Sequence, residues 1–168
     1  MNIFYTDNCP VKAANNLCTI HQNKQYQESC QLLATALQLS GVIDSGLCKP
    51  THQNHPVAVW LRSSVHHYHW LVEHTKALRE AYAKPEHGYD KYLEAILQHV
   101  PNLPNTDFVD PPKCVDDDIR KKSLFKPVTE CYKEYLKKKY VDWTTRTDKK
   151  QMSVKFVGVV PDYLKDVF

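Results

Sequence analysis

Residues 21–39 carry the pattern that most restricts the folds open to this chain. At about 100° per residue, one narrow apolar stripe of a helix contains Tyr26, Cys30, Leu33 and Leu37. Polar side chains share an arc of about 80° nearly opposite this stripe, and they are His21, Lys24, Glu28, Gln31 and Thr35. The pattern predicts an amphipathic helix from about His21 to Leu39.

The other segments indicate further helices and little strand. We expect short strands at 3–5 and 154–160, a terminal turn or tail at 162–168, and helices over about 10–18, 56–84, 89–100 and 127–143. Four prolines and three consecutive aspartates predict a long irregular connection over 101–118. The prediction is an all-α fold, a compact single domain (1–168) of four to five helices with minor short strands at the N- and C-terminal ends.

Composition places the chain among globular proteins. It has 168 residues, of which 42% are hydrophobic and 24% charged. The sequence has no apolar run long enough to span a membrane and no basic start followed by an apolar stretch. We therefore expect no membrane partner and a cytoplasmic location, in the host cytoplasm if the chain is phage-encoded. The six cysteines form no CxxC pair, so we expect reduced thiols, with Cys30 and Cys131 on apolar helix faces.

Basic residues are concentrated late in the chain. Residues 1–100 hold 8 Lys/Arg and 8 Asp/Glu, whereas residues 119–155 hold 12 Lys/Arg and 4 Asp/Glu, an excess of 8. Interleaved Tyr and Trp side chains suit a polyanion, because phosphate neutralisation dominates nucleic-acid affinity. This basic segment predicts nucleic-acid contacts at Lys137, Lys138, Lys139 and Arg146. The alternative is an ordinary solvated helix face.

The polar face of the 21–39 helix is the first candidate site. His21 and Glu28 are two turns apart, close enough to touch one ligand. A carboxylate beside a lysine and an imidazole suits general acid/base chemistry, and Lys24 would hold Glu28 ionised or bind a phosphate. Gln31 completes the group. The alternative is again a solvated face, since every amphipathic helix has one.

The turn over 51–56 is the second candidate. Free N–H groups at the start of the helix predicted from Pro56 would attract an anion, and two imidazoles beside them would donate to a phosphate or sugar. The binding residues expected here are Thr51, His52, Asn54 and His55. The alternative is N-capping by Asn54 or His55. Ser64 and Thr75, in the buried stripe of that helix, would need hydrogen-bond partners.

Metal or cofactor chemistry is not expected. His66, His67, His69 and His74 point in different directions on a helix, and no pair has the i, i+4 spacing of metal ligands. The sequence has no Gly-rich phosphate loop and no GxSxG motif, and only four glycines in all. We predict no metal site and no cofactor.

Two short motifs resemble a known family. The run from His21 to Glu28, a histidine followed seven residues later by a glutamate on the first long helix, is similar to the phage-type pyrimidine-dimer DNA glycosylases of the endonuclease V type. Asn54-His55-Pro56 resembles an Asn-His-Pro motif in small bacterial and phage proteins grouped with that family. The resemblance covers roughly residues 1–80 and implies a compact all-α domain.

The resemblance also implies a chemistry. In the family the equivalent glutamate is the catalytic carboxylate, the histidine lies in the DNA-binding site, and the N-terminal α-amine attacks the sugar C1′ to form a Schiff base before strand cleavage. This chain departs from the pattern, because Gln27 and Ser29 replace the arginines beside the glutamate, and Asn2 is bulky enough for Met1 to be retained. The nucleophile would then be the Met1 amine, Lys24 or water.

We therefore predict a DNA N-glycosylase with abasic-site lyase activity that acts on damaged or modified bases. Glu28 would be the acid/base, with His21 and Lys24 in the catalytic group, and DNA the partner. Gln31 and residues 51–55 would contact sugar and phosphate, and the basic segment would hold the strand. The alternatives are a non-enzymatic nucleotide or nucleotide-signal binder using the same pocket, and a DNA-binding protein without chemistry.

Overall fold

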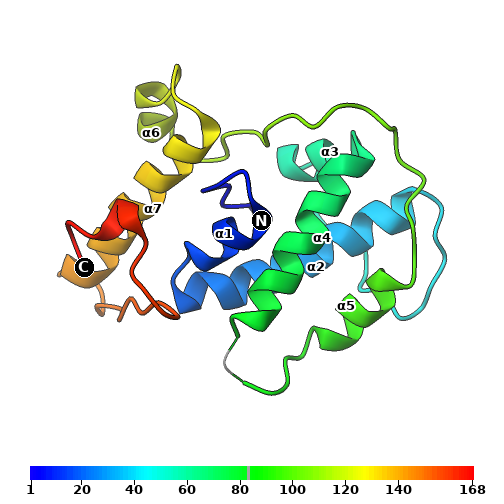
Figure 1. Cartoon of the computed structure of the whole chain (residues 1–168), viewed down its shortest axis with the longest axis horizontal. Coiled ribbons are helices and arrows are strands. Elements are labelled where there is room, and N and C mark those ends of the chain that lie inside the picture. Colours follow the sequence, from blue (N-terminus) through cyan, green and yellow to red (C-terminus); the bar gives the residue numbers. More distant parts are fainter. Residues whose placement is uncertain (83) are drawn as a thin grey trace.

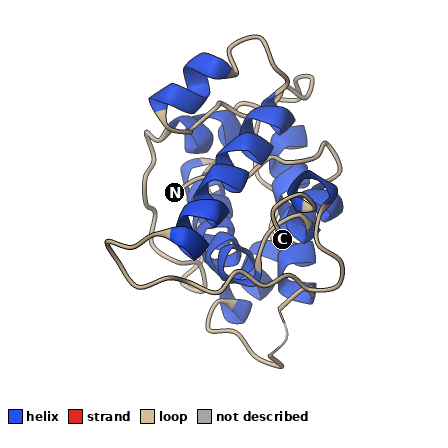
Figure 2. Cartoon of the chain, turned by 90° about the vertical axis from the view of Figure 1, so that its left-hand side faces the viewer, coloured by secondary structure: helices blue, strands red, loops and turns tan. Residues whose placement is uncertain are grey.

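The computed structural model describes residues 1–82 and 84–168. The described residues are all-α, as predicted, and the helices are α1 Pro10–Asn15, α2 Thr19–Leu39, α3 Pro56–Arg62, α4 Val65–Glu80, α5 Asp90–Leu97, α6 Asp117–Lys122, α7 Val128–Thr145 and the 3-10 turn η1 Asp162–Leu164. Figure 2 shows these helices joined by loops. None of the described helices is long and apolar enough to cross a membrane.

The helices form two groups with the N-terminal segment between them. Figure 1 shows α3, α4 and α5 on one side and α6, α7 and the C-terminal segment on the other. Helix α4 packs on α1 and α2, while α7 packs on α6 and η1. The buried Ile3, Phe4 and Tyr5 join a single apolar cluster with residues of α1, α2, α4 and α7. The start of the chain is therefore part of the core.

The prediction of two short strands is wrong. Residues 3–5 and 154–160 belong to no strand, and none occurs among residues 1–82 and 84–168. The backbone N–H of Phe4 donates to the Gln25 Oε1 atom at 3.4 Å, and the Thr19 N–H donates to the Lys155 carbonyl at 2.8 Å. Single hydrogen bonds to α2 satisfy these backbone groups, so the apolar runs at 3–5 and 154–160 did not indicate a sheet.

The predicted 56–84 helix is broken into α3 and α4. Ser64 is extended at φ −154° and ψ 142° and caps α4, its hydroxyl accepting from the His66 N–H at 3.2 Å. The same hydroxyl donates to the Thr106 carbonyl at 2.6 Å, and Thr75 donates to the Leu71 carbonyl at 2.6 Å. Both buried hydroxyls thus have partners. Residue 83, in the predicted last turn, lies outside the described residues.

Two other expectations concern α6 and the thiols. The described residues contain seven α-helices rather than four or five, and α6 begins within the last two residues of the irregular connection predicted over 101–118. Asp117 and Asp118 in the first turn of α6 and basic residues in its last turn complement the helix dipole, a local signal that predicts a helix.

All six cysteines are free, and Cys30 and Cys131 are buried as expected.

Candidate functional site

Glu28 lies near the middle of α2 with four nitrogen atoms around its carboxylate. Its Oε2 atom accepts from the Asn2 backbone N–H at 3.1 Å and from the Gln25 amide at 3.2 Å. Its Oε1 atom lies 3.8 Å from the Met1 α-amine and 3.7 Å from Lys24 Nζ. The Glu28 side chain is only 15% exposed, whereas Lys24 is 66% exposed. The polar face of α2 is therefore not a solvated face at Glu28.

Side chains hold the N-terminal segment against Glu28. The Asn2 amide donates to the Cys114 carbonyl at 2.6 Å, and the Tyr132 hydroxyl donates to Asn2 Oδ1 at 3.0 Å. Gln25 is buried and uses both ends of its amide, accepting from the Phe4 N–H while donating to Glu28. The segment that carries the Met1 amine is consequently held in place by residues of α2, α7 and the loop before α6.

A groove of about 430 Å³ opens beside this carboxylate. The N-terminal segment and α2 form one wall, and α7 with Met152 forms the other. Its lining combines aromatic rings, cations and one carboxylate, from Met1, Asn2, Phe4, Ile20, His21, Lys24, Gln25, Glu28, Tyr135, Lys139, Trp143 and Met152. Such a wall suits a planar ring with a nearby negative charge.

One face of α7 supplies the opposite wall. Tyr135, Lys139 and Trp143 follow one another at intervals of four residues, which places them on the same side of a helix. Lys139 Nζ lies 5.2 Å from the Tyr135 ring centroid and 5.7 Å from that of Trp143. It also donates to the Tyr135 hydroxyl at 3.2 Å. The lysine is thus held over the groove by the rings that line it.

His21 is buried in the wall of the groove and carries no charge near neutral pH. Burial, followed by the nearby positive charges of Lys139 and Lys24, lowers its pKa to about 3. Its Nδ1 atom lies 2.8 Å from the Tyr140 hydroxyl, and its ring packs 4.8 Å from that of Trp143. A neutral imidazole can exchange hydrogen bonds with a sugar or base but cannot form an ion pair with a phosphate.

The turn over 51–56 is fastened to α2. The Thr51 N–H donates to the buried Thr35 hydroxyl at 3.1 Å. His52 has φ 50° and lies with Nδ1 2.6 Å from the Thr51 hydroxyl. His55 is the N-cap of α3, its Nδ1 accepting from the Val57 N–H at 3.2 Å. That N–H is therefore already taken by His55, as in the capping alternative.

The same turn lies within electrostatic reach of Glu28. The pKa of His55 is lowered by burial first, then by the Met1 amine and by His52, while Glu28 acts to raise it. This influence links the turn over 51–56, which Thr35 fastens near the C-terminal end of α2, to Glu28 near the middle of that helix.

Several predicted site residues lie outside the groove lining, including Thr51, His52 and His55 of the turn. The Gln31 amide donates to the Tyr89 hydroxyl at 3.0 Å, toward α5 and outside the groove lining. Arg146 donates to the Lys150 carbonyl at 2.6 Å and so closes the loop after α7. Asn54 is exposed, and it is not among the groove residues.

The three consecutive lysines of α7, at 137–139, have different surroundings. Lys137 pairs with Asp166, and Lys138 pairs with Asp118 at 2.7 Å. Only Lys139 of the three lines the groove. Two of the predicted contacts are thus partly neutralised within the chain, because acids of α6 and of the C-terminal segment pack beside them.

A larger cavity of about 680 Å³ lies beside α5. Two of its charged groups pair with each other, since Arg79 contacts Asp90 at 2.6 Å, and the Tyr26 hydroxyl donates to Asp90 at 2.8 Å. The Arg79 guanidinium and these hydrogen bonds hold the pKa of Asp90 at about 2. This network fastens α5 to α2 and α4, and the Glu28 groove remains the better site.

No family is shown by comparison. No protein-family model matches the chain, and neither does any curated protein or solved structure. What bears on function is therefore the geometry around Glu28.

Sequence reasoning missed several residues of this groove. The sequence places Phe4 in the strand expected at 3–5 and Asn2 at the start of the chain. No pattern in the sequence distinguishes Gln25. Tyr135 and Trp143 carried a usable signal, because together with Lys139 they follow the i, i+4, i+8 spacing of one helical face. No local pattern links Asn2 or Gln25 to Glu28, since these contacts arise from packing.

Proposed function

We propose that the chain is a DNA glycosylase and abasic-site lyase whose nucleophile is the Met1 α-amine and whose acid/base is Glu28. The observation that carries the proposal is the 3.8 Å separation of that amine and the Glu28 carboxylate at the edge of an aromatic and basic groove. The resemblance of His21–Glu28 to the phage-type glycosylases supports the same chemistry. Unlike the flanking arginines of that family, Gln27 and Ser29 contribute no charge here.

The proposed reaction begins with the loss of a proton from the Met1 ammonium. An ammonium has no free electron pair, so attack requires loss of a proton, and the Glu28 carboxylate lies where it can accept that proton. The amine nitrogen then bonds to sugar C1′ while the base leaves with the bonding electrons and takes up the proton that Glu28 holds. The new C1′–N linkage gives a second proton to Glu28, which passes it to the ring oxygen O4′ as the C1′–O4′ bond breaks, so that an iminium forms and Glu28 is again a carboxylate. Glu28 next removes a proton from C2′, the C3′–O bond breaks, and the 3′ phosphate departs.

Met1 is a better-placed nucleophile than Lys24. Its side chain is 2% exposed and the adjoining Asn2 is held by its hydrogen bonds to Cys114 and Tyr132, whereas Lys24 is 66% exposed. An amine held in position loses little entropy on reaching a reactive carbon. Lys24, at the groove edge, would bind a phosphate.

Borohydride reduction on DNA containing an abasic site tests the proposal directly, because it converts the imine into a stable amine. We expect a protein–DNA adduct, and peptide mapping should find it on Met1. A glycine-serine extension before Met1 should abolish the adduct, and its removal should restore it. An adduct on Lys24 would reassign the nucleophile, and no adduct from a folded protein would contradict the lyase.

A specific observation favours a second candidate, a protein that binds a free nucleotide without cleaving DNA. The groove volume of about 430 Å³ is in the range of small-ligand sites, and Lys137 and Lys138 are paired with acids rather than free for a long phosphate backbone. Calorimetry with mononucleotides, beside anisotropy with labelled duplex at several salt concentrations, separates the two. Tight mononucleotide binding with weak duplex binding would favour this candidate, and duplex binding without any adduct would indicate a DNA-binding protein without chemistry.

A further inference from the structure

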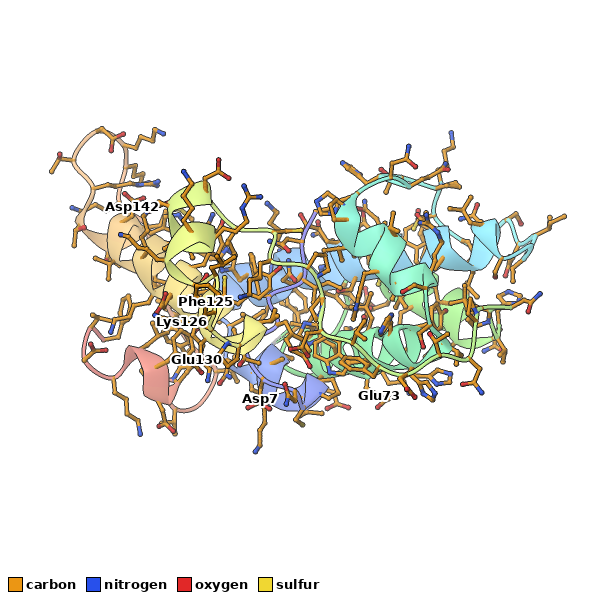
Figure 3. The ribbon with its side chains drawn as sticks, turned by 90° about the horizontal axis from the view of Figure 1, so that it is seen from above. Asp7, Glu73, Phe125, Lys126, Glu130 and Asp142 are labelled. Carbon is orange, nitrogen blue, oxygen red and sulfur yellow. The ribbon has the colours of Figure 1, made fainter. Side chains whose placement is uncertain are left out.

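The loop between α6 and α7 holds two apolar side chains in solvent. Phe125 is 97% exposed and Leu124 is 64% exposed. Folded proteins generally bury aromatic rings, and an apolar tip rimmed by polar residues marks an interaction site. Figure 3 labels Phe125 and Lys126 just before the start of α7 and Asp142 near its far end.

The base of this loop is anchored, so the exposure of its tip is built in. Ser123 is buried, and its hydroxyl donates to the Ile119 carbonyl at 2.6 Å. The half-buried Lys113 donates to the carbonyls of Ser123 at 2.6 Å and Lys126 at 2.7 Å. A lysine that spans both ends of the turn fixes its course and presents the intervening side chains outward.

The charge around the tip selects its partner. Residues 119–127 hold four cations and no acid, namely Arg120, Lys121, Lys122 and Lys126. Arg120 pairs with Asp117, and Lys126 pairs with Glu134 on α7. No ion pair involves Lys121 or Lys122 among the residues that the structure describes. An apolar tip flanked by cations matches the wedge that some proteins insert between base pairs while holding the adjoining phosphates.

We propose that Leu124 and Phe125 form a wedge that enters a base-pair step of duplex DNA and unstacks it, with Lys121 and Lys122 on the flanking phosphates. This inference rests on the proposed function for its choice of partner. Tyr135, in the groove wall, lies seven residues beyond Val128, the first residue of α7, or about 10 Å along the helix axis. This rise equals about three base-pair steps, so a duplex that runs along α7 would meet both the wedge and the groove.

Fluorescence of 2-aminopurine tests the wedge. The duplex would carry a tetrahydrofuran abasic analogue, which forms no imine, with 2-aminopurine in the opposite strand. We expect the protein to raise the emission about threefold or more, because an unstacked base is less quenched. Phe125→Ala should leave it near the free-duplex level and weaken duplex binding about tenfold. Ile43→Ala is the matched control, since Ile43 is 99% exposed in another loop.

A second measurement keeps the wedge separate from the chemistry. A single-stranded abasic oligonucleotide needs no unstacking, so borohydride trapping on it should be equal for the wild type and Phe125→Ala. If the wild type unstacks the duplex but never traps, the proposed function fails and the wedge stands. If Phe125→Ala unstacks the duplex as the wild type does, the wedge is wrong. If Phe125→Ala lost binding to vesicles of phosphatidylglycerol and phosphatidylcholine but kept its binding to the duplex, the tip would instead be assigned to an anionic membrane surface.

Discussion

At the scale of single residues, the unusual group is the Glu28 carboxylate. It receives hydrogen bonds from a backbone N–H and the Gln25 amide, and two amines approach it within 4.0 Å. Together these contacts fix the rotamer of the Glu28 side chain. A glutamate held this way beside a groove is suited to proton transfer rather than to solvation of a helix face.

Replacing that carboxylate should separate chemistry from binding. We expect Glu28→Gln to lower the rate of strand cleavage by about 100-fold or more, because the amide cannot accept the proton. Affinity for DNA should stay within about tenfold, or roughly 1.4 kcal/mol. Single-turnover cleavage and anisotropy measure the two quantities.

Glu73→Gln is the control for this change. Glu73 is 55% exposed and contacts Lys76 alone among the salt-bridge partners described, at 2.8 Å, so cleavage should be unaffected. Full activity in Glu28→Gln, or an unfolded protein by circular dichroism, would make Glu28 a structural residue.

At the scale of elements, α7 presents different chemistry on different sides. Leu136 and Tyr140 are buried, Lys139 lies over the groove, and Lys137 and Lys138 reach acids of neighbouring segments. The excess positive charge of the sequence is therefore not all available to one ligand. Position on the helix, rather than net charge, decides which lysine meets a phosphate.

This difference predicts unequal effects on salt dependence. We expect Lys139→Gln to reduce the slope of log K against log salt for duplex binding by about 0.9, the value of one lost phosphate contact. Lys137→Gln should change the slope far less, since Lys137 already pairs with Asp166. Anisotropy at four or more salt concentrations gives both slopes. Equal losses in the two variants would mean that α7 binds as an undifferentiated basic face.

At the scale of the whole molecule, two buried histidines tie distant segments together. His21 on α2 contacts Tyr140 of α7, and His74 on α4 lies with Nδ1 2.9 Å from the Pro10 carbonyl of α1. Burial lowers the pKa of His21 to about 3 and that of His74 to about 4. Both contacts are made by neutral imidazoles, so the fold depends on their staying uncharged.

Stability should therefore fall as the pH is lowered. In the unfolded chain both histidines have a pKa of about 6.5. At pH values between this pKa and the folded pKa values, the unfolded state therefore binds more protons than the folded state. The stabilisation that comes from the two neutral histidines is fully present above about pH 6.5 and is lost as the pH falls through their folded pKa values, about 4 for His74 and about 3 for His21. Each histidine contributes up to about 1.4 kcal/mol per pH unit.

Urea unfolding at pH 7, 6 and 5 measures this dependence. His21→Phe should reduce the slope between pH 6 and pH 5, because the phenyl ring has no proton to gain. The exposed His69 is the control site, and His69→Gln should keep the wild-type slope. A wild-type stability that is the same at pH 5 and pH 7 would contradict neutral burial of both histidines.

Local periodicity was enough to predict α2 and α7, because a helix satisfies its own backbone and its apolar stripe is visible in the sequence. The same pattern placed Glu28 and His21 on the polar side of α2 and Cys30 on its buried side. Local capping chemistry also narrowed the start of α3 to Asn54 or His55, since an N-cap needs only neighbouring residues, and the structure has His55 at that position.

The rest depended on contacts between distant residues. Ser64 is a weak local sign of a break, since serine is a preferred N-cap, but its hydrogen bond to the Thr106 carbonyl joins residues 42 positions apart. Only packing brings Met1 beside Glu28 and pairs Lys137 with Asp166, since both contacts join segments that neighbour each other in space alone. The sequence by itself determined the helices and their polar faces. The tertiary structure decided which polar groups share a groove, because long-range contacts are set by how buried surfaces fit together.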